Sequence, residues 1–412
     1  VNFSGINAMP LTKTDNMDCF VEFWDMNGNY FKKPAIINAQ GNSSLAFVKK
    51  NVSIDLLNED ESSFSLKLGD WVSQDSFHLK AYYTDYFRGT GAVGYSLFKL
   101  IADDLEYSKN RTWKKALINE GRDYSVGYNV PSKNALRVDD GALCFPQGFP
   151  CVVYLNGEFY GIFAWQLKKH RDNYMMEKNN NSHIHLDGEI GSDFFNGTID
   201  WTAFEIRNPK GLKDMNGNKY DGDNPQEIAE GPVKTAIVNF STRYAEIMAG
   251  ADIDAKKALI QQYFDVGNLI DYIIFCDLTY NVDGYRKNWQ WTTWDGVKWF
   301  VNPYDLDGIM GATPEGQNTY TPRTGHTGTG LTNAPTAFIY TYYTDELNAR
   351  YAYLRSQGIL TPKKFIDAFD EWVKAVGNDN YKKEWTKWPD SPCNRDIVVN
   401  SDYWEMVTDA DG

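Results

Sequence analysis

The first third of the chain carries apolar residues at alternate positions, which is the spacing of half-buried β-strands. Residues 52–56 follow this period of two, and residues 77–83 fit another strand. Two apolar runs, at 19–24 and 30–31, flank a turn that contains Asn27-Gly28. Asn-Gly between apolar runs is the strongest short-range signal for a hairpin. This part of the chain is therefore predicted to be rich in strands.

Two further hairpins are predicted from the same signal. The first joins residues 151–155 to 159–165 through an Asn-Gly pair, and the second joins 289–294 to 297–301 through Asp-Gly. In both cases the flanking runs are rich in aromatic and β-branched residues, which favour strands. The second hairpin lies in a part of the chain that is otherwise helical.

Helices are predicted where the apolar spacing changes to three or four residues. Between 91 and 101, Val93, Leu97 and Ile101 recur on one helical face. The remaining predicted helices are at 233–249, 255–264, 266–278, 344–357 and 361–376.

The order of the predicted elements indicates how the chain is organised. Strands come first and helices dominate later, which predicts an α+β fold of two lobes. The strand-rich lobe would span 1–170 and the mainly helical lobe 171–412. Residues 177–232 are rich in Asn, Asp and Gly and predict an insertion in the second lobe. Residues 311–335, rich in Gly, Thr and Pro, predict a long loop.

Composition excludes several classes of protein. The 412 residues carry 41 basic and 55 acidic side chains, a net charge of −14, whereas nucleic-acid binders normally have a basic excess. A hydrophobic content of 42% is ordinary for a folded chain, and no apolar run is long enough to span a membrane. No signal segment is present, but an acidic composition rich in Asn, Tyr and Trp favours an exported protein, periplasmic or at the cell surface.

The densest group of candidate catalytic residues surrounds the predicted hairpin at 289–301. Asp283 and Asn288 precede it, and Asp305 and Asp307 follow it, so the hairpin can bring all four together. Carboxylate and amide oxygens suit Mg²⁺, and kinases place a catalytic Asp five residues before a metal-binding Asn, the same offset as here. The alternative interpretation is that these are turn and helix-cap residues.

A second candidate segment begins at Gly41. Ser43 and Ser44 follow this glycine, and Lys49 and Lys50 lead into a predicted strand. Backbone N–H groups of such a turn can face phosphate oxygens, and a strand lysine can hold phosphates as a point charge. The GxxxxGK[ST] loop is absent. The alternative is an ordinary turn before a lysine-rich edge strand.

Four segments taken together resemble the CotH family of atypical, protein-kinase-like proteins. They are GNSSLAFVKKNVSIDL, KAYYTDYFRGTGAVGYSLFKLI, CVVYLNGEFYGIFAWQLKK and DGYRKNWQWTTWDGVKWFVNPYDLDGIMG, which run from about 41 to 311 in the family's order. The resemblance implies a two-lobed protein-kinase-like fold and transfer of the ATP γ-phosphoryl group to Ser or Thr of a protein substrate, with Mg²⁺ or Mn²⁺. The strand-rich lobe would lie next to the nucleotide and the helical lobe would carry catalysis and metal.

The resemblance also implies roles for individual residues. Asp283 would be the catalytic base, and Lys50, in preference to Lys49, would be the nucleotide lysine. Arg88 would contact phosphate or stabilise the interface between the lobes. The residues assigned to the nucleotide are Lys50, Lys49, Arg88, Ser43 and Ser44, and those assigned to the metal are Asn288, Asp305 and Asp307.

The chain departs from the family pattern at several positions. Gln40 stands where the family has Arg before the Gly-x-Ser-Ser turn, and Gln166-Leu167 stands where a Glu usually follows the hairpin. Tyr304 replaces the Trp of the family's PWDxD segment. These changes leave open a second hypothesis, a catalytically degenerate kinase-like module that binds a cell-surface protein or glycan. A hydrolase is disfavoured because no GxSxG motif is present.

The tryptophans at 289, 291, 294 and 299 bear on the second hypothesis. Their alternation favours the core of a hairpin over a sugar-binding platform. His183 and His185, with Asp187, could bind a metal, but they lie in the polar insertion with no partner helix, which disfavours a metal site.

Overall fold

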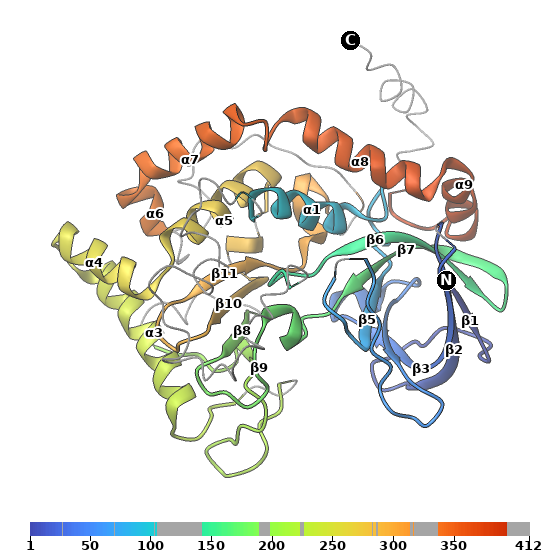
Figure 1. The fold of residues 1–412 in the computed structure, drawn as a ribbon, viewed down its shortest axis with the longest axis horizontal. Helices are drawn as coiled ribbons and strands as arrows, with labels where there is room; N and C mark the ends of the chain where they lie inside the picture. Colours follow the sequence, from blue (N-terminus) through green and yellow to red (C-terminus); the bar gives the residue numbers. More distant parts are fainter. Residues whose placement is uncertain are drawn as a thin grey trace.

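The computed structural model describes most of the chain. The described residues are 1–26, 28–69, 71–102, 104, 142–188, 198–222, 226–281, 283–285, 287–313, 316 and 337–393. They form a β-barrel, a second β-sheet and helices that cover both (Figure 1). Most of the loop predicted at 311–335 lies outside the described residues.

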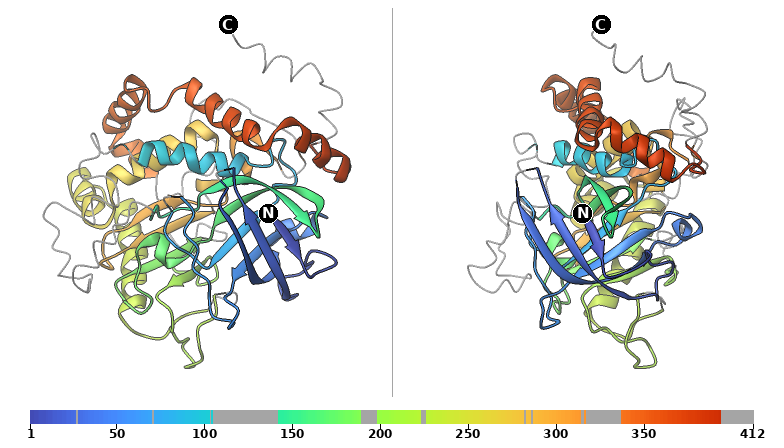
Figure 2. Two further views of the ribbon diagram at one scale, coloured as in Figure 1. Left: turned by 45° about the vertical axis from the view of Figure 1, so that its right-hand side comes forward. Right: turned by 90° about the vertical axis from the view of Figure 1, so that its right-hand side faces the viewer.

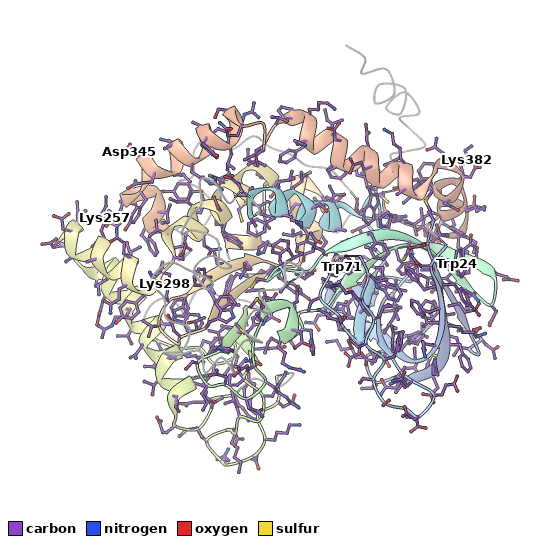
Figure 3. All side chains as sticks on the ribbon, viewed as in Figure 1. Trp24, Trp71, Lys257, Lys298, Asp345 and Lys382 are labelled. Atoms are coloured by element: carbon purple, nitrogen blue, oxygen red, sulfur yellow. The ribbon has the colours of Figure 1, made fainter. Side chains whose placement is uncertain are left out.

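Seven strands form a closed barrel in the order β1-β2-β3-β4-β5-β7-β6. They are β1 (Asn2–Ser4), β2 (Met17–Trp24), β3 (Tyr30–Gln40), β4 (Asn51–Leu56), β5 (Ser76–Lys80), β6 (Gly148–Leu155) and β7 (Glu158–Leu167). Neighbours are antiparallel except β1 and β6, whose parallel pairing of Asn2 with Tyr154 closes the barrel. Buried side chains such as Phe3, Val21 and Trp165 form the core of the barrel. Figure 3 shows that side chains fill the space enclosed by the strands.

The predicted hairpins of the barrel are confirmed. Trp24 pairs with Tyr30 across the turn between β2 and β3. Leu155 pairs with Glu158 across the turn between β6 and β7, where Gly157 has φ of +83°. A residue with a side chain would be strained at that angle, so the Asn-Gly pair fixes both the turn and the strand register.

The second sheet has four strands in the order β11-β10-β8-β9. Its strands are β8 (Ile184–Gly188), β9 (Phe204–Asn208), β10 (Trp289–Thr293) and β11 (Phe300–Pro303). The predicted Asp-Gly hairpin is the β10–β11 pair. β8 and β9 come from the segment 177–232, which was predicted to be an insertion. That segment therefore supplies half of the strands of this sheet.

Helices pack against the second sheet and along the barrel. They are α1 (Thr90–Ala102), α3 (Pro232–Ala249), α4 (Ile253–Tyr263), α5 (Val266–Thr279), α6 (Ala337–Tyr342), α7 (Thr344–Ser356), α8 (Pro362–Val376) and α9 (Asn378–Lys387). The described residues also form the 3₁₀ turns η1 (Ser43–Ala46), η3 (Arg171–Tyr174), η5 (Asp283–Tyr285) and η6 (Leu306–Gly311).

α1 packs on α5 through Phe98 and Phe275, whose rings are 5.2 Å apart. α8 and α9 follow β6 and β7 along the barrel (Figure 2).

The α+β class is confirmed, but the predicted two-lobed protein-kinase-like fold is wrong. The first strands form a closed barrel, and the second half adds a four-stranded sheet to its helices, which does not match a two-lobed kinase fold. The physical reason is long-range pairing. β1 meets β6, about 150 residues later, and β8 inserts between β9 and β10.

Two simpler properties complete the fold. No disulfide joins the five cysteines, all of which lie in the described part of the chain. None of the described helices combines the length and the apolar character that crossing a membrane requires.

Candidate active site

The β10–β11 hairpin brings Asn288 and Asp305 to one end of the second sheet. Asn288 directly precedes β10, Asp305 follows β11 by two residues, and the register pairs Trp289 with Pro303. As a result the Asn288 amide nitrogen lies 3.5 Å from the backbone oxygen of Asp305. These two candidate metal ligands therefore lie together, as the predicted hairpin requires.

Both residues have left-handed backbone conformations. Asn288 has φ of +57° and Asp305 has φ of +49°, a region that residues other than glycine seldom adopt, although Asn and Asp tolerate it best. Such conformations persist where surrounding contacts hold them, and they cluster at functional sites. For Asp305, one such contact is the hydroxyl of Tyr95 on α1, which accepts its backbone N–H at 3.0 Å.

Asp283 lies on the turn η5, which α5 holds in place. The hydroxyl of Tyr272 on α5 donates to the carbonyl of Gly284 at 2.7 Å, and the Asn281 side chain accepts the Gly284 N–H at 3.0 Å. The Asp283 carboxylate is 41% exposed and forms an ion pair of 3.1 Å with Lys287. It is therefore accessible to a substrate while its backbone is fixed.

Asp307 lies in the turn η6, next to Asp305. Loss of solvation around its carboxyl and electrostatic repulsion from Asp305 raise the pKa of Asp307, and the charge of Asp283 raises it further. The side chain is exposed to water, which weakens the first of these effects. The carboxylates of Asp305 and Asp283 thus both lie within electrostatic reach of the Asp307 carboxyl.

Lys80, at the end of β5, faces these carboxylates and was not among the predicted residues. Its ammonium lies 3.9 Å from Asp305 Oδ1, and its side chain is 9% exposed. Its charge opposes the rise in the pKa of Asp307. The sequence gives no signal for this role, because the pairing of a barrel strand with a turn 225 residues later depends on the tertiary fold.

The turn η1 carries Ser43 and Ser44 and is linked to the end of β5. Asn51 donates from its amide to Ser44 Oγ at 3.1 Å and accepts the backbone N–H of Ala81 at 2.7 Å. Gly41 has φ of +114°, and a Cβ there would lie 1.9 Å from Ser44 Oγ, so a side chain is excluded. The turn thus lies beside Lys80 on the barrel.

Lys50, the favoured nucleotide lysine, is engaged with the same turn. Its ammonium donates to the carbonyl oxygens of Leu45 at 2.6 Å and Phe47 at 2.5 Å. Lys50 therefore satisfies backbone oxygens at the end of η1 and stabilises the conformation of the turn.

Lys49 is enclosed in the protein interior. Its ammonium donates to Glu384 Oε1 at 2.7 Å and to the carbonyl of Ile162 at 2.5 Å, and its side chain is fully buried. Burial lowers the pKa of Lys49 to about 8, against the opposing effect of Glu384. The sequence around Lys49 gives no sign of this partner, because Glu384 lies 335 residues later in the chain, in α9.

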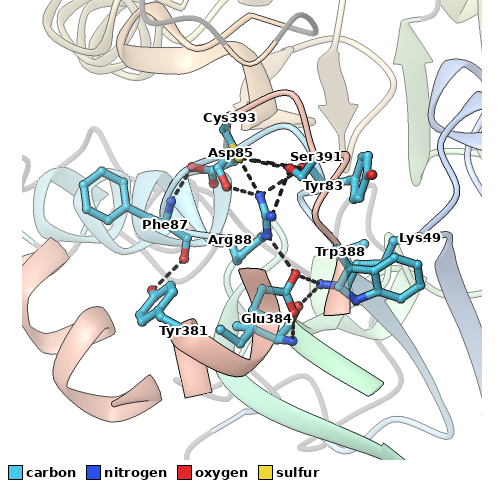
Figure 4. Close-up of polar contacts among 12 residues, drawn as sticks. Lys49, Tyr83, Asp85, Phe87, Arg88, Tyr381, Glu384, Trp388, Ser391 and Cys393 are labelled. Atoms are coloured by element: carbon cyan, nitrogen blue, oxygen red, sulfur yellow. Dashed lines mark hydrogen bonds and ion pairs between the residues drawn. The ribbon is translucent and has the colours of Figure 1, made fainter. Parts of the chain in front are cut away.

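Glu384 joins Lys49 to Arg88 (Figure 4). Arg88 Nε donates to Glu384 Oε1 at 2.9 Å, and its terminal nitrogens contact Ser391 and Cys393 in the segment after α9. Burial alone would raise the pKa of Glu384, but Lys49 and Arg88 together lower it. Arg88 is therefore buried where the barrel meets the C-terminal segment.

A second buried ionic cluster lies beneath the candidate site. Asp187 of β8 accepts Arg207 Nε at 2.9 Å and also pairs with Lys169, whose ammonium lies 3.9 Å from the centre of the Tyr304 ring. Burial would raise the pKa of Asp187, but the two cations lower it. The cluster supports Tyr304, the neighbour of Asp305.

The other sequence candidates have structural roles. The four tryptophans of the β10–β11 region are at most 2% exposed, so they belong to the core, as the favoured interpretation predicts. His185 is fully buried and contacts Gln290, and His183 accepts the N–H of Glu177 at 3.0 Å. These histidines, expected in a polar insertion, are therefore buried in the protein.

The donor set suits a cation that is shared with a phosphate. Within the described residues, no three His, Cys, Asp or Glu side chains are arranged to hold a metal by themselves. Mg²⁺ commonly takes one or two carboxylates and completes its shell with water and substrate phosphates. The crowded carboxylates of Asp305 and Asp307, with the Asn288 amide, fit that pattern.

Comparison with known proteins gives one result. The model of a family described as CotH kinase protein matches residues 37–408, which is nearly the whole chain. No curated protein matches the chain.

Proposed function

The chain belongs to the CotH family, and from this premise we propose that it transfers the γ-phosphoryl group of ATP to Ser or Thr of a protein substrate, with Mg²⁺ or Mn²⁺. Family membership itself implies no more than a kinase-like function. The ATP, the metal and the acceptor are our proposal, and the residues around the β10–β11 hairpin support it.

Asp283 would act as the base. Its exposed carboxylate can accept the proton of the acceptor hydroxyl, whose oxygen takes the γ-phosphoryl group as ADP leaves. The anchoring of Gly284 by Tyr272 and Asn281 keeps this carboxylate in place before the acceptor arrives. Preorganisation of this kind lowers the barrier because little rearrangement remains for the reactive complex.

Asn288, Asp305 and Asp307 would hold the metal. When bound, Mg²⁺ or Mn²⁺ supplies positive charge that neutralises the phosphate oxygens as charge develops on them. The side chains of these three residues supply oxygen ligands, and the contact of Tyr95 with the Asp305 backbone orients one of them. Ser43 and Ser44, in the turn η1, would contact the phosphates.

One observation carries the proposal. Asp305 and Asp283 both repel the ionised form of Asp307, and the Asn288 amide lies 3.5 Å from the backbone oxygen of Asp305. Clustered carboxylates favour a nearby cation, and a divalent metal would add to the charge that Lys287 and Lys80 already supply. The types of these residues, and the match of the chain around them to the family, together favour phosphoryl transfer over another role for the cluster.

The test is transfer of ³²P from γ-labelled ATP to protein, with the chain itself and casein as acceptors. We expect labelling that requires Mg²⁺ or Mn²⁺ and falls at least about 100-fold in Asp283→Asn, the typical effect of losing a general base. Asp345→Asn, an exposed acidic residue in the first turn of α7, is the matched control and should label at the wild-type rate. Equal labelling by Asp283→Asn and wild type would refute the assignment of the base.

A further inference from the structure

Buried cations in this protein are almost all hydrogen-bonded. Lys49 and Arg88 share Glu384, Arg350 pairs with Asp271 at 2.7 Å, and Lys256 donates to the Tyr342 hydroxyl at 2.8 Å. This is the expected pattern, because taking a charge out of water is costly unless it is paired and hydrogen-bonded.

Lys80 is the exception among the described residues. Its side chain is 9% exposed, yet its ammonium makes no hydrogen bond there, and its ion pair with Asp305 is long at 3.9 Å. The partner is also shared, since the Asp305 side chain is 39% exposed and belongs to the proposed metal site. Among the described residues, none accepts a hydrogen bond from this ammonium, so its three protons are available to a ligand.

The surroundings of Lys80 indicate the chemistry of that partner. The turn η1 is tied through Asn51 to the backbone of Ala81, the residue after Lys80. Asp305 lies 3.9 Å from the Lys80 ammonium. A ligand that contacts this ammonium therefore lies next to a carboxylate that suits Mg²⁺, near the end of β5 to which the Ser turn is linked. A phosphate chain with a bound divalent cation is complementary to all three.

We propose that Lys80 binds the phosphate oxygens of the metal–nucleotide complex, a role that the sequence had suggested for Lys50 or Lys49. The inference rests on the proposed function. Lys49 donates to Glu384 and Ile162 and Lys50 donates to two backbone carbonyls, so moving either ammonium to a ligand would leave those oxygens unsatisfied. Lys80 has no such bonds to break.

This role predicts opposite effects on two ligands. Without nucleotide, Lys80 is a positive charge close to Asp305, so its removal should strengthen binding of Mn²⁺ alone. With nucleotide, the same removal takes away a phosphate contact, so binding of the metal–phosphate complex should weaken. A residue that merely maintains the fold would change both affinities in the same direction.

The experiment is calorimetric titration of Lys80→Met, Lys80→Arg and wild type with MnCl₂, Mg²⁺–AMP-PNP and Mg²⁺–tripolyphosphate. We expect Lys80→Met to bind Mn²⁺ at least as tightly as wild type and to bind the two phosphate ligands at least tenfold more weakly. Lys80→Arg, which keeps the charge, should stay within about threefold for all. Lys168→Met is the control, because Lys168 directly follows β7 of the same barrel and its ammonium already has a partner, Asp55, at 2.8 Å.

The outcomes separate this inference from the proposed function. If wild type and Lys80→Met bind Mg²⁺–AMP-PNP equally, the role of Lys80 is wrong and the function stands. If wild type binds tripolyphosphate through Lys80 but not AMP-PNP, the kinase proposal fails and the phosphate contact stands. If wild type binds neither phosphate ligand, both are wrong. The melting temperature of Lys80→Met should not fall, since the variant removes an incompletely paired buried charge; a clear fall, with both affinities reduced, would show a structural role.

Discussion

At the scale of single residues, Glu384 is a clear case of a long-range contact that determines local structure. One oxygen of its carboxylate accepts hydrogen bonds from Lys49 and Arg88, and the other accepts the backbone N–H of Ile162 at 2.7 Å. A Cβ on Gly161 would lie 2.8 Å from the Lys49 side chain and 2.9 Å from Glu384, so glycine is needed beside the ion pair. The barrel, the segment before α1 and α9 therefore meet at one buried charge.

Removing that charge should be costly. Glu384→Gln leaves Lys49 and Arg88 buried without a counter-charge, and we expect unfolding free energy to fall by about 3 kcal/mol or more in urea titrations. Asp367→Asn breaks an exposed pair with Lys363 and should change stability by less than about 0.5 kcal/mol. The double variant Lys49→Met with Glu384→Gln should recover part of the loss. A Glu384→Gln protein as stable as the control would contradict the account.

Two buried histidines make stability depend on pH. Burial lowers the pKa of His185 to about 3, and burial with nearby lysines lowers the pKa of His78. In the unfolded chain both take up a proton near pH 6.5. Because the unfolded state then binds more protons than the folded state, stability falls as pH drops below 6.5 and is retained above it.

Between pH 6.5 and pH 5 the slope should approach about 1.4 kcal/mol per pH unit for each of these histidines. Urea titrations at several pH values measure the total slope, and His185→Gln should lower it by about 1.4 kcal/mol per pH unit. Ring proton shifts of both histidines should stay constant in this range. Titration of either ring near pH 6.5 in the folded protein would show that it is not held neutral.

At the scale of elements, the sequence predicted what local signals determine. The Asn-Gly and Asp-Gly pairs located three hairpins, because a turn signal between two apolar runs is a local feature of the sequence. Of the three turns, the one between β6 and β7 is the two residues Asn156-Gly157, and the register leaves longer turns between Trp24 and Tyr30 and between Thr292 and Phe300. The register of the β10–β11 hairpin then brought Asn288 and Asp305 together. β8 and β9 were missed although Ile184–Gly188 and Phe204–Asn208 each alternate apolar and polar residues, because two apolar positions in five residues are a weak signal within a segment rich in Asn, Asp and Gly.

Contacts between distant elements could not be predicted in this way. Closure of the barrel depends on β1 pairing with β6, and the environment of Lys80 depends on the meeting of β5 with the turn after β11. The segment of α9, NDNYKKEWTK, looks like an exposed polar helix, yet Glu384 within it is buried. In each case the decisive partner lies more than 100 residues away, where composition and periodicity carry no information.

The docking of α8 over the start of α1 can be tested with one methyl group. A Cβ on Gly89 would lie 2.0 Å from the ring of Trp372, whose indole N–H donates to the Phe87 carbonyl at 2.9 Å. Gly89→Ala should therefore destabilise the protein by about 1–3 kcal/mol through overpacking. In Gly222→Ala the nearest atom would be Glu205 Oε2 at 3.6 Å, so this control should be nearly neutral. Equal stability of the two variants in urea would show that α8 is not held against Gly89.

At the scale of the whole molecule, the candidate site lies where the barrel and the second sheet meet. The barrel contributes Lys80 and the turn η1, the second sheet contributes Asn288 and Asp305, and α1 connects the two by contacting the Asp305 backbone through Tyr95. The C-terminal helices complete the arrangement, since Glu384 fixes Arg88 just before α1. Phosphate binding would therefore be a property of the assembled fold rather than of one segment.

The most direct test of this account is metal-dependent nucleotide binding, measured by the melting temperature and by calorimetry with AMP-PNP, with Mg²⁺, and with both. The account predicts that wild type is stabilised most when both ligands are present, as expected when a ligand binds only the folded state. Asp305→Asn, which keeps the shape and tolerates the left-handed backbone, should bind the pair at least tenfold more weakly. Nucleotide binding that needs no metal, or that Asp305→Asn leaves unchanged, would contradict the proposed site.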